Sequence, residues 1–166
     1  GYYFGGKEGL LTALLERDAL TALAALERLV ASPLPPERKL ERHIRGVIQT
    51  YYRFPYINRL INRLQSESPE TAELLARVFI APLQALQYRI VAEGIAVGRF
   101  RRVDPWFLYH AVIGMCEFVF QSRSTLPFLD GARPLTPETC DAYAAHVLNL
   151  VLRGIAADTS QDRMIP

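Results

Sequence analysis

The sequence predicts an all-α fold, a helical bundle of about six helices, and three observations support that prediction. Apolar residues recur at spacings of three and four along most of the chain, which is the period of an amphipathic helix. A small polar residue precedes proline at Ser68-Pro69, Asp104-Pro105 and Thr136-Pro137, and each pair is a typical helix start. Strand signals are missing, because no Asn-Gly or Asp-Gly pair separates two runs of alternating hydrophobicity.

Three helices are expected in the first part of the chain. The first runs from Lys7 to about Val30 and is built on leucines at helical spacing: Leu10, Leu11, Leu14, Leu15, Leu20, Leu23, Leu26 and Leu29. The second begins at Pro35-Pro36-Glu37 and carries Leu40, Ile44, Val47, Ile48 and Tyr51. The third follows Pro55, which ends the preceding element, and carries Ile57, Leu60, Ile61 and Leu64.

Three longer or more apolar helices are expected after them. The fourth starts at Ser68-Pro69, carries Leu75, Phe79, Leu83, Leu86 and Ile90, and contains Pro82, which should kink or split it. The fifth, from Pro105 to about Gln121, is apolar on nearly every side, so it must be buried on more than one face. The sixth runs from Pro137 to about Ala156 and contains small residues that allow close approach.

The composition is that of one globular domain. Half of the 166 residues are apolar and 22% are charged, which argues against disorder and allows one sizeable core. Neither a secretory signal nor an uncharged run long enough to cross a membrane is expected. The two cysteines, Cys116 and Cys140, have no metal-like spacing, so a reduced, cytoplasmic protein is expected. The net charge of +2 neither requires nor excludes a nucleic-acid partner.

The opening residues permit two interpretations. Gly1, Gly6 and Lys7 match most of the phosphate-loop pattern G-x-x-x-x-G-K-[ST]. That pattern requires Ser or Thr after the lysine and a β-strand before the loop, whereas Glu8 follows the lysine and no sheet is predicted. The other interpretation is the joint between two helices of a DNA-binding domain, and the all-helical pattern favours it.

The stretch Tyr2-Tyr3-Phe4-Gly5-Gly6-Lys7-Glu8-Gly9-Leu10-Leu11 resembles the end of the helix-turn-helix in the TetR family of bacterial transcriptional repressors. In that family an aromatic pair and a Phe end the recognition helix, a Gly/Ser turn follows, and Lys-Glu begins the next helix. The remaining helices also resemble those of the family in number and length, although more weakly. The segment Asp104 to Leu129 resembles the effector domains of a pyrimidine-responsive branch of the family. The head of the family has three helices, so about forty further residues are expected before Gly1.

The resemblance implies a function and a division of the chain. It implies a cytoplasmic TetR-like repressor that binds a palindromic DNA operator through that head, binds a small-molecule effector and forms a homodimer. Residues 1–6 would end the DNA-binding domain, residues 7–157 would form the effector-binding and dimerisation domain, and residues 158–166 would be a flexible tail. Tyr3 and Lys7, at the N-terminal end of the first helix, are expected to contact DNA phosphates.

An effector site requires a few polar groups that converge on an apolar pocket. The candidates for this pocket are Tyr52, Gln87, Tyr109, Ile113 and Glu117. Glu117 is the most informative of them, since it lies between Cys116 and Phe118 on the most apolar helix. A buried carboxylate is costly, so Glu117 should pair with an arginine of a neighbouring helix, be neutral, or contact a ligand.

The last two helices are expected to form the dimer interface. Tyr143, Val147, Leu150 and Gly154 follow one another at spacings of four, three and four, which predicts one continuous stripe. Such a stripe would be a larger exposed patch than monomers usually tolerate. Pairing the two helices about a two-fold axis gives a four-helix interface, which suits two heads on a palindrome.

No enzymatic activity, cofactor, metal or membrane partner is predicted. The histidines His43, His110 and His146 lie on different helices without a second ligand one turn away, so a zinc site is not indicated. Ser122 and Thr125 lie in a loop without the glycines of a nucleophile elbow. The alternative function, from a different class, is a helical small-molecule-binding module with no DNA role.

Overall fold

Residues 6–158 fold into six long helices and a short 3₁₀ turn, Leu126–Phe128; one of the six consists of α4 and α5 joined by a π-helical turn. The computed structural model describes the backbone of residues 6–158 and the side chains from Glu16 onward. The α-helices are α1 (Gly6–Ala31), α2 (Pro36–Arg53), α3 (Pro55–Glu67), α4 (Pro69–Leu75), α5 (Ala81–Ala96), α6 (Pro105–Gln121) and α7 (Pro137–Ile155). Over residues 6–158 no strand forms, only an isolated bridge between Phe100 and Ala156. The predicted all-α fold is confirmed.

The predicted helix starts are side-chain caps in the structure. Ser68, Asp104 and Thr136 accept hydrogen bonds at 2.9–3.1 Å from the backbone N–H groups of Thr71, of Trp106 and Phe107, and of Thr139. Each cap satisfies a donor that the first turn of a helix leaves without a partner. The start of α2 at Pro35 has no side-chain cap and relies on proline in the first turn.

Pro82 changes the geometry of its helix without ending it. Proline has no N–H, and its ring collides with the carbonyl four residues earlier, which here belongs to Val78. A π-helical turn, Ala76–Ile80, lies at this position and joins α4 to α5, so that Pro69–Ala96 is one long helix. The disturbance predicted at Pro82 is therefore a widened turn.

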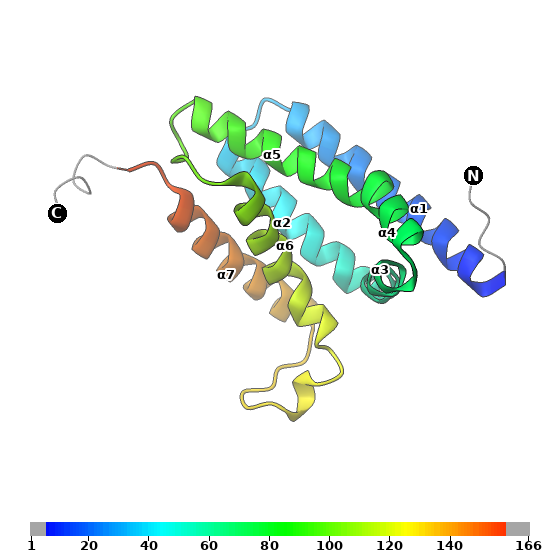
Figure 1. Cartoon of the computed structure of the whole chain (residues 1–166). Helices are drawn as coiled ribbons and strands as arrows, with labels where there is room; N and C mark the ends of the chain where they lie inside the picture. Colours follow the sequence, from blue (N-terminus) through cyan, green and yellow to red (C-terminus); the bar gives the residue numbers. More distant parts are fainter. Residues whose placement is uncertain (1–5, 159–166) are drawn as a thin grey trace.

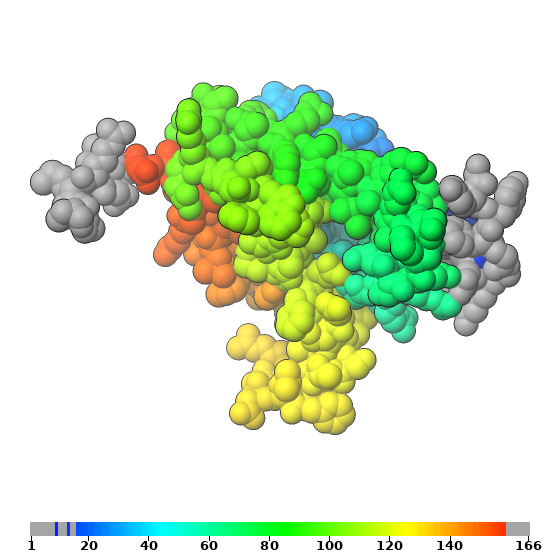
Figure 2. Space-filling model, in the orientation of Figure 1, coloured from blue at the N-terminus to red at the C-terminus, as the bar shows by residue number. Residues whose placement is uncertain are grey.

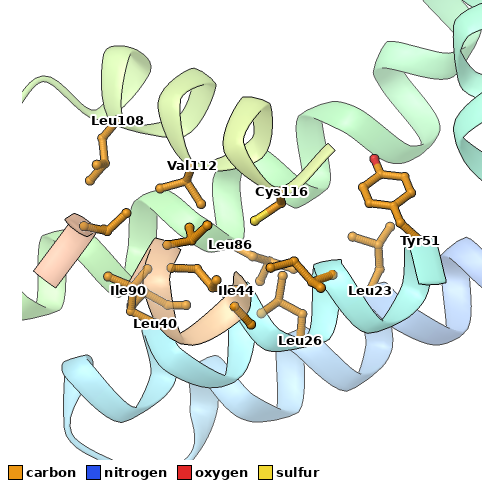
Figure 3. Packing of buried hydrophobic residues seen from close by; sticks show 14 of the residues in the cluster. Leu23, Leu26, Leu40, Ile44, Tyr51, Leu86, Ile90, Leu108, Val112 and Cys116 are labelled. Atoms are coloured by element: carbon orange, nitrogen blue, oxygen red, sulfur yellow. The ribbon is translucent and has the colours of Figure 1, made fainter. Parts of the chain in front are cut away.

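The helix α2 is the centre of the bundle. It contacts α1, α3, α5, α6 and α7, and it runs through the middle of the helices in Figure 1. Leu40 and Ile44 of α2 are fully buried. Figure 3 shows these two side chains among others from α1, α5 and α6, which together form a single core.

The helices α6 and α7 lie side by side and run antiparallel (Figure 1). The hydroxyl of Tyr143, in the first half of α7, donates to the carbonyl of Met115, in the second half of α6, at 2.5 Å. The segment before α6 is tied to the end of α7, because the N–H of Arg101 donates to the carbonyl of Ile155 at 2.9 Å. The two helices thus form a pair with one face on α2 and the other face outward.

In the part of the chain that the structure describes, one helix has the length and composition of a membrane span. Pro69–Ala96 contains a stretch of 18 residues with a mean hydropathy of 1.2, of which 28% is buried. The expectation of no such segment rested on uncharged runs alone, and this helix carries charged residues. Core helices of soluble proteins have the same properties, and Pro69–Ala96 packs against α1, α2, α3 and α6. By itself it is weak evidence for a membrane.

Candidate effector site and dimer surface

An apolar cavity opens between α1 and α2. Its volume is about 290 Å³, close to the lower end of the range for small-molecule sites, roughly 300–1,000 Å³. Most of its wall is aliphatic or aromatic. The wall includes Leu23, Leu26 and Leu29 of α1, Val47 of α2, Phe54 between α2 and α3, Ile57 of α3, Phe79 of the π-helical turn and Leu83 of α5. The charged side chains on the wall, Arg42 and Arg53, are both exposed.

Small residues leave the space for this cavity. Ala22 and Ala25 of α1 line it, as does Gly46 of α2. A Cβ atom placed on Gly46 would meet no atom within 4 Å. Arg42, Gly46 and Arg53 are four and seven residues apart, so they lie on one face of α2. Ala25 and Gly46 are exposed, so these small residues leave the cavity open to solvent between the two helices.

A buried polar pair lies at the cavity wall. His43, which lines the cavity, is 3% exposed and Gln87 of α5 is fully buried. His43 Nε2 lies 3.0 Å from Gln87 Oε1. Burial lowers the pKa of His43, and the hydrogen bond to Gln87 opposes this only in part. The imidazole is therefore neutral at pH 7, and its Nε2–H donates to the amide oxygen.

The amide nitrogen of Gln87 has no hydrogen-bond partner among the residues that the structure describes. A buried donor without a partner costs about 1–3 kcal/mol. Gln87 does not itself line the α1–α2 cavity, so this donor lies behind His43 and not on the cavity wall.

The predicted effector residues are dispersed over two sides of α2. None of the five lines the α1–α2 cavity, and Gln87 is connected to it through His43. Tyr52 lies in a groove of about 280 Å³ between α2 and α7. Tyr109, Ile113 and Glu117 lie on α6, which contacts α2, α3, α5 and α7 but not α1. The prediction missed the cavity because its signal, small residues on α1 and α2, does not differ from ordinary close packing in a sequence.

Glu117 belongs to a polar cluster between α3 and α6. Asn58 Nδ2 donates to Glu117 Oε1 at 3.1 Å, and Asn62 Nδ2 donates to Asn58 Oδ1 at 3.2 Å. Burial raises the pKa of Glu117, and the bond from Asn58 opposes the rise in part. Burial, followed by the charge of Glu117, raises the pKa of Tyr109 to about 12. The sequence predicts an arginine of a neighbouring helix as one possible partner of Glu117. In the structure, the amide of Asn58 on α3 is a hydrogen-bond partner.

The outer face of α6 is apolar and exposed. Trp106, Phe107 and Phe118 are 53%, 67% and 67% exposed. Gly114 lies between the two phenylalanines, and a Cβ there would meet no atom within 4 Å. The apolar character of α6 on nearly every side, which predicted burial on several faces, therefore leaves one face uncovered within the subunit.

The predicted stripe on α7 is divided between the core and the surface. Leu150 is 52% exposed, and Gly154 is also exposed. Val147 is 1% exposed and packs inside the subunit, and Tyr143 is half-buried against α6. Val147 therefore presents no surface to a partner, which corrects the prediction that it lies on the same outward stripe as Leu150.

The predicted DNA contacts lie at the edge of the described chain. Tyr3 lies outside the described residues, and Lys7 lies in the first turn of α1, where side chains are not described.

Among residues 6–158, no group of three or more His, Cys, Asp or Glu side chains is placed to hold a metal ion. Cys116 is buried, and burial raises the pKa of its thiol to about 12.

Comparison with known proteins identifies the family. The family model for the tetracycline-repressor-like C-terminal domain matches residues 33–161, more than half of the chain. The crystal structure of a TetR/AcrR-family transcriptional regulator from Thermobifida fusca has a TM-score of 0.70 at 23% identity, covering 92% of this chain and 76% of that chain. This likeness supports the fold. A search of curated proteins found no match. The chain belongs to the TetR family of transcriptional regulators, and most of it is the C-terminal domain of that family.

Proposed function

We propose that the protein is a cytoplasmic transcriptional repressor that binds a small-molecule effector in the α1–α2 cavity and dimerises through α6 and α7. A helix-turn-helix head, expected before Gly1, would bind a palindromic operator, with Tyr3 and Lys7 on backbone phosphates. Membership of the TetR family supports a regulatory function.

The position of the cavity on α1 is the observation that carries this proposal. α1 is a helix of 26 residues that begins at Gly6, beside the residues that resemble the end of the head. Leu23 and Leu26 of α1 line the cavity together with residues of α2 and α5. A ligand that binds one arrangement of these helices better than another shifts the equilibrium by the difference between its two binding free energies.

The C-terminal end of α1 is held in place. Lys39 Nζ donates to the carbonyl of Val30, near the end of α1, at 2.7 Å and to Glu93 of α5 at 2.8 Å. Lys39 is 2% exposed, so these bonds satisfy an ammonium group that water does not reach. With this end held by α2 and α5, we expect effector binding to move the N-terminal end of α1, where the head is attached.

The exposed face of α6 and α7 supports the proposed homodimer. Phe107 and Phe118 of α6 and Leu150 of α7 are each more than half exposed. Small residues beside them, such as Gly114 and Gly154, allow two helices to approach closely. Packed about a two-fold axis, α6 and α7 of two subunits would bury this apolar surface in a four-helix interface.

The test uses the full-length protein and two substitutions of one residue. Gly46 lines the cavity, so Gly46→Trp is designed to fill it with an indole, whereas Gly46→Ala leaves most of it open. We expect the neutral apolar dye N-phenyl-1-naphthylamine to bind the Ala variant like the wild type and to bind the Trp variant at least about tenfold more weakly. Operator affinity should differ between the two variants. Equal dye binding by both variants, with equal operator affinity, would contradict the proposal.

A further inference from the structure

A second cleft lies where the end of α2 meets the segment that connects α6 to α7. Its volume is about 520 Å³. The connecting segment, residues 122–136, projects from the body of the molecule in Figures 1 and 2 (yellow). The cleft is lined by Tyr52, Arg53, Arg123 and Arg133 and by the apolar residues Leu126, Pro127, Pro134 and Leu135.

Three arginines, one from the end of α2 and two from the segment that connects α6 to α7, converge on this cleft. Arg53 ends α2, Arg123 follows α6, and Arg133 precedes α7. None of the described Asp or Glu residues lines the cleft. Within residues 6–158, none of the three arginines is in an ion pair with an acidic residue, whereas Arg45 pairs with Asp141 at 2.7 Å in the adjoining groove. The cleft therefore concentrates positive charge that the described chain does not neutralise.

Two of the three guanidinium groups are held over aromatic rings. Arg53 Cζ lies 5.7 Å from the ring centroid of Phe54, and Arg123 Cζ lies 5.8 Å from that of Phe120. Cation–π contacts at this distance restrict the guanidinium without using its N–H donors. The donors of Arg53 and Arg123 therefore stay available to a ligand, and less entropy is lost when they bind it.

We propose that this cleft binds a small molecule that carries two or more carboxylate or phosphate groups on a partly apolar body. The planar guanidinium matches the geometry of carboxylate and phosphate groups and binds them through two parallel hydrogen bonds. The hydroxyl of Tyr52 is a further donor, and the leucines and prolines supply an apolar wall. The site is separate from the effector cavity, and Arg53 lines both.

Citrate and inorganic pyrophosphate are the probes for the test, and isothermal titration calorimetry on the full chain is the measurement. We expect one of them or both to bind saturably at one site per chain. Arg53→Gln, Arg123→Gln and Arg133→Gln should each weaken binding by about tenfold, as expected for the loss of one charge-assisted pair. Arg89→Gln, which removes an exposed arginine that does not line the cleft, is the matched control and should change affinity by less than about twofold.

A random-sequence DNA duplex distinguishes a small-molecule site from a general polyanion surface. If the duplex displaces the probe and Arg89→Gln weakens binding as much as the cleft variants, the positive surface acts as a whole and the proposal is wrong. Binding that survives the triple substitution of Arg53, Arg123 and Arg133 would also overturn it. Because all three arginines lie at the surface of the cleft, unchanged circular-dichroism melting of each variant would show that lost binding does not come from lost folding.

Discussion

The α1–α2 side and the α6–α7 side of the bundle share a sequence feature but differ in what lies around it. Gly46 on α2, Gly114 on α6 and Gly154 on α7 are helical glycines at which a Cβ would meet no atom within 4 Å. Gly46 is exposed, and it lines an open cavity whose other walls come from α1, α3 and α5. Beside Gly114 and Gly154 lie exposed apolar side chains. Small residues on a helix thus create room, and the tertiary neighbours decide whether that room becomes a pocket or a surface.

A substitution on the exposed face of α7 is expected to give the largest effect. Leu150→Arg places a charge on the face of α7 that is proposed to meet a partner, and a buried unpaired charge costs several kcal/mol. We expect the dimer to dissociate at micromolar concentration and operator binding to be lost, as measured by sedimentation velocity and a DNA-binding titration. A stable monomer of the unsubstituted protein at the same concentration would refute the proposed interface.

The buried side of the same helix should respond differently. Val147 is 1% exposed inside the subunit, so Val147→Ala should lower the free energy of unfolding by about 2 kcal/mol through lost burial and a residual cavity. The neighbouring Leu148→Ala, at a half-buried position, serves as the comparison and should cost less. Urea unfolding at fixed protein concentration measures both. An effect of Val147→Ala on dimer affinity alone, with unfolding of the subunit unchanged, would place Val147 in the interface.

Replacement of Glu117, on α6, should change the free energy of unfolding least, and the change should depend on pH. Because burial raises the pKa of Glu117, its protonated form favours folding. That stabilisation is complete below the unfolded-state pKa of about 4.5 and is lost as the pH rises through the folded value. Glu117→Gln stays neutral, so it should match the wild type near pH 4 and exceed it at pH 8, by less than about 1 kcal/mol for this half-buried group. A stability difference of equal size at both pH values would show that ionisation of Glu117 is not its cause.

The sequence predicted the helices because their signals are local. Apolar spacing located each helix, and the caps at Ser68, Asp104 and Thr136 form as expected. The aromatic-Gly-Lys-Glu stretch at the start led to the family that the comparisons confirm. Each of these signals lies within a few neighbouring residues, so no knowledge of packing was required.

The site residues were harder to predict because they depend on which helix faces meet. Tyr143 and Leu150 lie on one heptad of α7, yet Tyr143 packs on Met115 and Leu150 points to the surface. Gln87 is predicted from the sequence to line an effector pocket. In the structure it does not line the α1–α2 cavity, but it forms a hydrogen bond with His43, which does. Periodicity distinguishes an apolar face from a polar one, but it does not distinguish two apolar faces, one for the core and one for a partner.

The position of α1 across the dimer tests the central claim, that filling the cavity moves this helix. A spin label attached at Glu16→Cys, on the exposed side of α1, reports the distance between the two subunits by pulsed electron resonance. We expect a defined inter-subunit distance in the Gly46→Ala background and a shifted distance in Gly46→Trp, which is designed to fill the cavity with an indole. The absence of inter-subunit coupling, or the same distance in both backgrounds, would contradict it.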